Sequence, residues 1–210
     1  SMCLLALLAE LAEARHFSLA AVHFNHNLRG AESDGDAAFT EAYCRKIGIS
    51  CHTGSGDVTG FARANGLGIE AAARRLRYDF FEQIAAETGT DYIATAHTAD
   101  DNAETVLMNL ARGTGLRGLC GIPPIRGQII RPMLTITRRE IEQYLTEHEI
   151  PHREDSSNQT DDYTRNVVRH HIVPVMEQVN FGFLNHISNM TLLTRRDHDY
   201  LNQQAKEFYR

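Results

Sequence analysis

The segment 91–121 constrains the fold most strongly, because a buried strand, a polar turn and a helix follow one another there without a break. Apolar or small residues over 92–96 predict a short strand, and His97 stands where that strand ends. Residues 98–101 offer helix-capping side chains, and residues 102–110 have the spacing of an amphipathic helix. This order is typical of the ligand-binding edge of an α/β sheet.

The helix that follows this turn opens with acidic residues. Asp101 and Glu104 are three residues apart, so a helical start places both carboxylates on one face, near the positive end of the helix dipole. A simpler interpretation is that Asp100 and Asp101 only cap the helix. We expect Asp101 and Glu104 to face a crevice and Asp100 to be a cap.

Helical patterns alternate with short apolar strands along the chain, which predicts an α/β fold, a parallel sheet with helices on both faces. A helical C-terminal segment follows. We expect a catalytic domain over 1–178 and the start of an accessory helical segment over 179–210. The expected helices are 2–15, 33–47, 57–65, 69–87, 102–110 and 137–147, and the expected strands are 17–24, 49–53 and 92–96. Residues 128–132 are expected to form a short edge strand or an extended link.

A second polar cluster, the His- and Asn-rich residues 23–29, follows the strand predicted over 17–24. Carboxyl ends of parallel strands share one edge of a sheet, so we expect both polar turns at the same edge. The alternative is a buried His23 beside turn-forming asparagines. Zinc between His23 and His26 is disfavoured, because no cysteine or carboxylate stands nearby at ligand spacing.

The composition limits the function classes. A net charge of −6 speaks against a broadly basic nucleic-acid-binding surface, so any RNA contact has to be local. The four cysteines form no Cys-x-x-Cys pair, which argues against a zinc ribbon or an iron–sulfur site and favours reduced thiols in a cytoplasmic protein. No apolar run approaches the ~20 residues of a membrane span, so we expect no membrane partner.

Two stretches, His97-Thr-Ala-Asp-Asp-Asn-Ala-Glu-Thr105 and Arg112-Gly-Thr-Gly-Leu-Arg-Gly-Leu119, resemble the tRNA(Ile)-lysidine synthetase family of the ATP-pyrophosphatase (PP-loop) superfamily. The resemblance covers most of 2–178 and implies an adenine-nucleotide alpha-hydrolase-like fold. It implies ATP-dependent ligation of free lysine to the wobble cytidine of tRNA(Ile), through an adenylated base, with release of AMP and pyrophosphate. ATP and Mg²⁺ are the implied cofactors. The sequence leaves the oligomeric state open, and a homodimer is compatible with it.

The resemblance also implies site residues. It assigns to Arg77, or second to Arg74, the neutralisation of phosphate charge as pyrophosphate leaves, although a run of arginines is more often a solvated face. Glu104 would hold or deprotonate the lysine ammonium, with Asp101 beside the cytosine or the lysine. The implied ATP-binding residues are His23, Asn25, His26 and His97, and the implied substrate- or tRNA-binding residues are Arg29, Arg112, Asp155, Asn158, Arg165 and Arg169.

Two other functions stay open. A PP-loop enzyme that thiolates tRNA would be expected to show paired catalytic or cluster-binding cysteines, which this sequence lacks. The second is a non-catalytic nucleotide- or RNA-binding module. It is supported by the absence from the sequence of the Ser-Gly-Gly-x-Asp-Ser phosphate loop, which precedes such a first helix in the resembled family. We therefore expect the polypeptide of residues 1–210 to bind ATP weakly or not at all.

Overall fold

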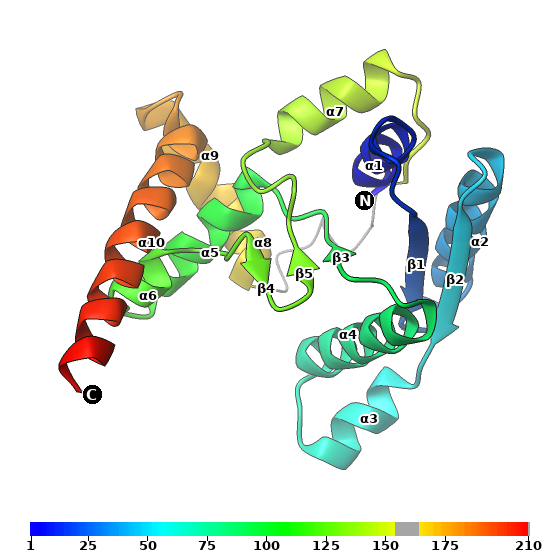
Figure 1. Cartoon of the computed structure of the whole chain (residues 1–210), viewed down its shortest axis with the longest axis horizontal. Helices are drawn as coiled ribbons and strands as arrows, with labels where there is room; N and C mark the ends of the chain where they lie inside the picture. The colour runs from blue at the N-terminus through cyan, green and yellow to red at the C-terminus, as the bar shows by residue number, and fades with distance from the viewer. Residues whose placement is uncertain (154–163, 210) are drawn as a thin grey trace. The chain divides into compact units, whose positions relative to one another are not determined.

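The computed structural model describes residues 1–153 and 164–209, and its chain contacts define two compact units, Met2–Ile93 and Ala94–Arg210. We call them the N-terminal and C-terminal units and describe each by itself (Figure 1). The two units meet at residues 93 and 94. The boundary expected between a catalytic domain over 1–178 and an accessory segment from residue 179 is a separate matter and stays a prediction.

The N-terminal unit is built on two parallel strands. β1 (Ala20–Asn25) pairs with β2 (Ser50–Ser55) in a register that joins Ala20 to Ser50 and Asn25 to Ser55. The parallel pairing confirms the alternation seen in the sequence, with both strands ending one to two residues later than predicted. The helices of this unit are α1 (Met2–Arg15), α2 (Ala31–Lys46), α3 (Val58–Asn65) and α4 (Ile69–Thr88).

Helices cover both faces of this strand pair, as predicted. On one face the Phe24 ring lies 5.6 Å from the Phe80 ring of α4. A Cβ added at Gly54 would lie 2.5 Å from the Phe80 ring, so the closeness of α4 requires glycine there. On the other face the Thr53 hydroxyl donates to Glu41 of α2 at 2.9 Å, because successive strand residues point to opposite sides.

The C-terminal unit contains a three-stranded sheet of order β3-β5-β4, with β4 and β5 antiparallel. The strand predicted over 92–96 is shorter in the structure, because after a last backbone bond from Thr95 to Ile130 the chain turns into a helix cap. The elements of the C-terminal unit are β3 (Ile93–Ala94, at the boundary of the units), α5 (Ala99–Ala111), α6 (Leu116–Leu119), β4 (Ile125–Arg126), β5 (Ile129–Ile130), α7 (Arg138–Glu147), α8 (Thr164–Val167), the π-helical turn η2 (Val168–Ile172), α9 (Val173–Val179) and α10 (Phe183–Phe208).

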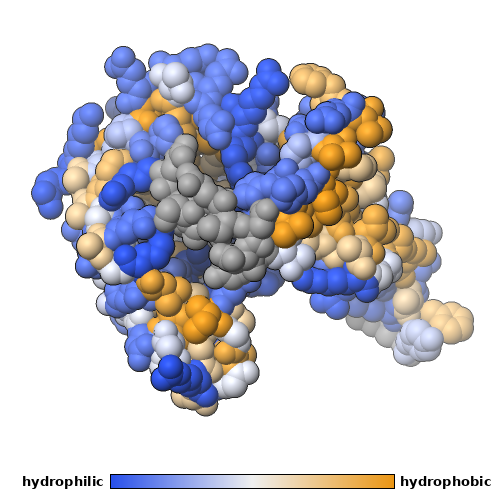
Figure 2. All heavy atoms as spheres, turned by 180° about the vertical axis from the view of Figure 1, so that it is seen from behind, coloured by the Kyte–Doolittle hydropathy of each residue, from blue (hydrophilic) through white to orange (hydrophobic). Residues whose placement is uncertain are grey.

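The core of this unit joins α5 to the C-terminal helices. Ala103 of α5 is buried against Val168 and Val173, and against Phe183 and Leu184 of α10. The predicted C-terminal helical segment is therefore packed on the helix that carries the acidic residues. Figure 2 shows hydrophobic side chains also at the surface of these C-terminal helices, and exposed members are Val175, Val179, Leu193, Tyr200 and Phe208. No helix within the described residues is long and apolar enough to cross a membrane.

Candidate active site

The acidic turn at the start of α5 is fixed by a capping box. The Thr98 hydroxyl, at the N-cap, accepts from the backbone N–H of Asp101 at 3.2 Å. The Asp101 carboxylate in return accepts from the backbone N–H of Thr98 at 2.9 Å and from its hydroxyl at 3.1 Å. This reciprocal arrangement satisfies two helix-end donors and orients Asp101, so the predicted capping role of the 98–101 turn is confirmed.

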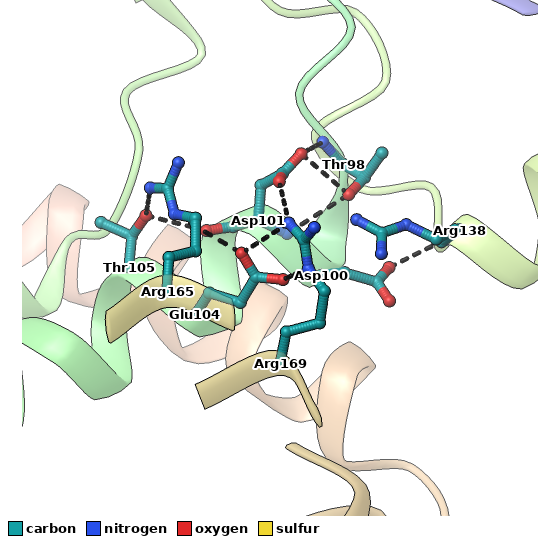
Figure 3. Close-up of polar contacts among 8 residues, drawn as sticks. All are labelled: Thr98, Asp100, Asp101, Glu104, Thr105, Arg138, Arg165 and Arg169. Carbon is teal, nitrogen blue, oxygen red and sulfur yellow. Dashed lines mark hydrogen bonds and ion pairs between the residues drawn. The ribbon is translucent and has the colours of Figure 1, made fainter. Parts of the chain in front are cut away.

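Asp101 and Glu104 face two arginines from distant sequence (Figure 3). Arg169 of η2 donates to both oxygens of Glu104, from Nε at 2.6 Å and from Nη2 at 3.1 Å, and its Nη2 lies 3.5 Å from Asp101. Arg165 of α8 lies 3.5 Å from Glu104 through Nε and donates to Thr105 at 3.2 Å. We call Asp101, Glu104, Arg165 and Arg169 the acid–arginine cluster.

Burial divides this cluster into an inner and an outer part. The Glu104 side chain is 1% exposed, whereas those of Arg169, Asp101 and Arg165 are 15%, 17% and 38% exposed. Both Glu104 oxygens are occupied by Arg169. Contact between Glu104 and a lysine ammonium stays a prediction, and it requires Arg169 to give up at least one of its bonds. Asp101 is the more accessible carboxylate.

Glu104 and Arg169 depend on each other for their charge. Burial raises the pKa of the Glu104 carboxyl, while the hydrogen bond and the charge of Arg169 act in the opposite direction. Burial alone would lower the pKa of the Arg169 guanidinium, but the hydrogen bond and charge of Glu104 outweigh it, so the pKa of Arg169 is raised. A carboxylate buried this deeply needs its cation to stay ionised.

The two arginines come from a helix with an irregular turn. Arg165 lies in α8, and Arg169 lies in the π-helical turn η2 that directly follows it. Such turns occur often at functional sites. Arg165 and Arg169 pair with carboxylates of α5, which lie more than 60 residues away in sequence.

Asp100 does not cap α5. Its Oδ2 accepts from the backbone N–H of Arg138 at 2.7 Å, at the first residue of α7, and the α5 capping box uses Asp101 instead. The expectation that Asp100 caps its own helix was wrong, because Thr98 as N-cap puts Asp101 at the third helical position, from which a side chain reaches back to the cap.

Asp100→Asn is expected to be mild. The amide oxygen of Asn still accepts from the Arg138 N–H, and only the negative charge near the start of α7 is lost, so the free energy of unfolding should fall by about 1 kcal/mol at most. Urea denaturation checks this against wild type. Turnover per folded molecule should be close to wild type, and a large kinetic loss without a stability loss would place Asp100 in the chemistry.

A second cluster lies in the N-terminal unit, at the end of β1. Asn25 is 9% exposed, donates to Asp34 of α2 at 2.9 Å and accepts from the Asn27 N–H at 2.8 Å. The His26 ring packs edge-on to Phe24 at 5.1 Å, and its buried Nδ1 has no hydrogen-bond partner among the described residues. An unpaired ring nitrogen of this kind is available to a ligand.

Among the charged groups that act on the His26 ring, Arg77 of α4 has the largest effect on the pKa of that ring. Its charge lowers the pKa of His26, and burial in turn lowers the pKa of the Arg77 guanidinium, which stays charged at neutral pH. Arg77 is half-buried, and within residues 1–153 and 164–209 no hydrogen bond or ion pair joins it to a carboxylate. Such a cation is suited to an anionic ligand.

The other residues predicted around β1, His23 and Arg29, interact with acidic residues of α2. His23 pairs in register with Thr53, on the α2 side. Burial lowers the pKa of His23, and the charges of Asp36 and Glu41 offset this only in part. Arg29 is held by Glu32 at 2.8 Å and Asp36 at 3.0 Å. Of the charged groups that lower the pKa of His26, Arg77 has the largest effect, and His23 and Arg29 act more weakly.

The ring of His26 gives a pH-dependent prediction. Burial, followed by the charges of Arg77, His23 and Arg29, lowers its pKa from 6.5 to about 4. Between these values the unfolded chain binds a proton that the folded chain does not, so the free energy of unfolding should fall as the pH is lowered through this window. His26→Gln should remove that part of the pH dependence.

Chemical denaturation from pH 7 to 4 gives the unfolding free energy as a function of pH for wild type and for His26→Gln, and the two curves are compared. His16→Gln, at an exposed position, is the matched control and should follow wild type. Parallel curves for wild type and His26→Gln would contradict the assignment.

The remaining predicted residues lie apart from these clusters or outside the described chain. His97 shares a hydrogen bond with the Thr95 hydroxyl at 3.0 Å through Nδ1. Arg112 is exposed, and Arg74 is exposed with its guanidinium 4.8 Å from the Tyr78 ring. Asp155 and Asn158 lie outside the described residues. No group of three or more His, Cys, Asp or Glu side chains in the described parts could hold a metal ion.

Sequence reasoning assigned no role to three residues that support the acid–arginine cluster. Asn102 and Thr191 join α5 to α10 by a hydrogen bond of 3.1 Å, and Arg195 donates to the backbone carbonyls of Cys120 and Ile122. The only signal for these residues in the sequence was the place of Asn102 inside the motif 97–105.

The fold and the two clusters define an α/β protein with polar residues gathered at the carboxyl end of β1 and just beyond β3, where such proteins bind ligands. The chain belongs to the PP-loop domain family, whose family model matches residues 1–176.

Similar proteins include one named tRNA(Ile)-lysidine synthase from Porphyromonas gingivalis, 47% identical over 181 residues, which covers 86% of this chain and 39% of the relative. One of the same name from Bacillus subtilis is 41% identical, over 99% of this chain and 44% of its own length. The chain thus spans less than half the length of these relatives. The solved structure of the U34-tRNA thiolase NcsA from Methanococcus maripaludis with its [4Fe-4S] cluster has a TM-score of 0.74 at 20% identity, covering 93% of this chain and 68% of the thiolase, which shows a shared fold.

Proposed function

We propose that this chain carries the catalytic PP-loop domain of an enzyme that ligates free lysine to the wobble cytidine of tRNA(Ile), using ATP. The observation that supports this most is the identity of 38% to 47% to several proteins named tRNA(Ile)-lysidine synthase, over 76% to 100% of this chain. The substrates, ATP and tRNA, belong to the cytoplasm, where we expect the enzyme to act.

The proposed first step is adenylation of the base. The cytosine carbonyl oxygen attacks the α-phosphorus of ATP, a P–O bond to the base forms, and the P–O bond to pyrophosphate breaks. Negative charge builds up on the departing phosphates, and Arg77, a half-buried cation without a carboxylate partner among the described residues, can offset it. The proposed hydrogen-bonding group beside it is His26, whose buried Nδ1 has no partner in the described part of the chain and whose lowered pKa keeps the ring neutral near pH 7.

The proposed second step is displacement of AMP by lysine. The lysine amine forms a C–N bond at the activated base carbon, the C–O bond to AMP breaks, and the amine loses a proton. We assign to Asp101 the contact with the lysine ammonium or its proton, because this carboxylate is more exposed than Glu104. Glu104 then acts on Arg169 and Arg165, holding their charge and orientation.

Arg165 is the more exposed of the two arginines in this cluster and is suited to an anionic partner, either the substrate RNA backbone or the carboxylate of lysine. Exposed Arg112 is a further RNA contact in this proposal. Mg²⁺ commonly accompanies ATP chemistry, where one or two carboxylates and the substrate phosphates are enough to hold it. The described residues contain no group of three or more His, Cys, Asp or Glu side chains that could hold a metal ion.

The experiment is a two-stage assay on the complete gene product. With ATP and tRNA(Ile) but no lysine, we expect pyrophosphate release and an adenylated tRNA. With lysine added, AMP should appear in amounts equal to the tRNA that is modified. Pyrophosphate release that needs no tRNA, or AMP release unaffected by lysine, would refute the proposal.

A further inference from the structure

A single buried amide links the acidic helix to the C-terminal helix. Asn102, between Asp101 and Glu104 in sequence, is 2% exposed. Its Nδ2 donates to the Thr191 hydroxyl of α10 at 3.1 Å, and its Oδ1 accepts from the backbone N–H of Ile122 at 2.8 Å. The side chain therefore spans from α5 to α10 and to the 121–122 turn.

This link allows little movement. Gly121 has φ +60°, and a Cβ there would lie 2.2 Å from Asn102 Oδ1, so the turn approaches the amide as closely as glycine permits. The Thr191 hydroxyl donates its proton to the Ser188 carbonyl at 2.8 Å, which leaves its oxygen to accept from Asn102. Arg195, one turn further along α10, donates to the carbonyls of Cys120 and Ile122.

We propose that Asn102 is a positioning residue of the active site, and that through it α10 holds the first turns of α5 in the place where Asp101 and Glu104 act. The carboxylates stand one residue before and two residues after Asn102, so any release of this side chain from α10 shifts both. The inference rests on the proposed function for its catalytic part, whereas the restraint on α5 is a property of the chain alone.

Two substitutions at Thr191 and one control at Ser188 test the hydrogen bond between Asn102 and Thr191. Thr191→Val keeps the shape and removes the hydroxyl that accepts from Asn102. Thr191→Ser keeps the hydroxyl. Ser188→Ala is the matched control, because the buried Ser188 hydroxyl oxygen has no hydrogen-bond partner in the described part of the chain. We expect Ser188→Ala to behave as wild type, since nothing is left unpaired.

Hydrogen exchange read by mass spectrometry tests the restraint without any assay of function. In Thr191→Val, exchange of the amides over 99–104 should rise on the order of fivefold, the loss of one buried hydrogen bond. Peptides of the N-terminal unit should be unchanged, and Thr191→Ser and Ser188→Ala should match wild type. Unchanged exchange over 99–104 in Thr191→Val would overturn the proposal.

Kinetics of the complete gene product test the catalytic part. Thr191→Val should raise the KM for lysine about fivefold and leave the rate of tRNA adenylation near wild type, with Thr191→Ser restoring the KM. A KM for lysine equal to wild type, or equal losses in both steps, would overturn the positioning role. A wild-type enzyme without lysine-dependent activity would instead refute the proposed function, and the exchange result would still decide whether Asn102 holds α5.

Discussion

Arg77→Ala is expected to slow adenylation of the tRNA on the order of 10²-fold or more, as when one donor to developing charge is removed. The Arg77 guanidinium is half-buried, close enough to His26 to lower the pKa of that ring, and without a carboxylate partner in the described chain. Its charge is therefore available to phosphate oxygens as pyrophosphate leaves. The affinity for lysine should stay nearly unchanged, because the second step no longer involves pyrophosphate.

Single-turnover formation of adenylated tRNA, without lysine, measures this step. Arg75→Ala is the matched control on the same helix, because exposed Arg75 lies 3.9 Å from Asp79 and is already paired. It should adenylate at the wild-type rate. A normal rate for Arg77→Ala would make Arg77 a structural residue only.

Arg169→Met is expected to cost about 3 kcal/mol of unfolding free energy, the scale for removing one partner of a buried ion pair. Arg169 supplies both short bonds to Glu104, whose side chain is 1% exposed, and Arg165 at 3.5 Å is a weaker substitute. The cost therefore comes mainly from leaving a buried carboxylate without its cation.

A double-mutant cycle separates that cost from lost packing. Glu104→Gln together with Arg169→Met should recover a substantial part of the stability, because no unpaired buried charge remains. Arg165→Met, at a side chain 38% exposed, should cost less than 1 kcal/mol and serves as the control. Strictly additive losses for Glu104→Gln and Arg169→Met, measured by urea denaturation, would contradict the coupling.

Local signals in the sequence were sufficient for the secondary structure around the sites. The Thr98–Asp101 cap, the following helix and the parallel pairing of β1 with β2 depend on neighbouring residues and on simple periodicity. The short strand β3 shows the limit of this reasoning, because its apolar run predicted five residues and tertiary pairing uses two.

The partners of the acidic residues could not be read from spacing. Asp100 meets Arg138 across 38 residues, Glu104 meets Arg169 across 65, and Asn102 meets Thr191 across 89. Periodicity places a side chain on a helix face but does not say what lies opposite that face. Only the family resemblance points to Arg165 and Arg169. The sequence of α10 predicts an accessory segment, because it is polar outside the few residues that pack on α5.

Mass spectrometry of the wobble nucleoside tests the central claim most directly. After incubation of the complete gene product with tRNA(Ile), ATP and lysine, the cytidine at that position should gain the mass of one lysine less one water, and only when all three substrates are present. A nucleoside in which sulfur replaces oxygen would indicate a thiolating enzyme, and an unmodified cytidine would indicate a binding module. Either result would contradict this account.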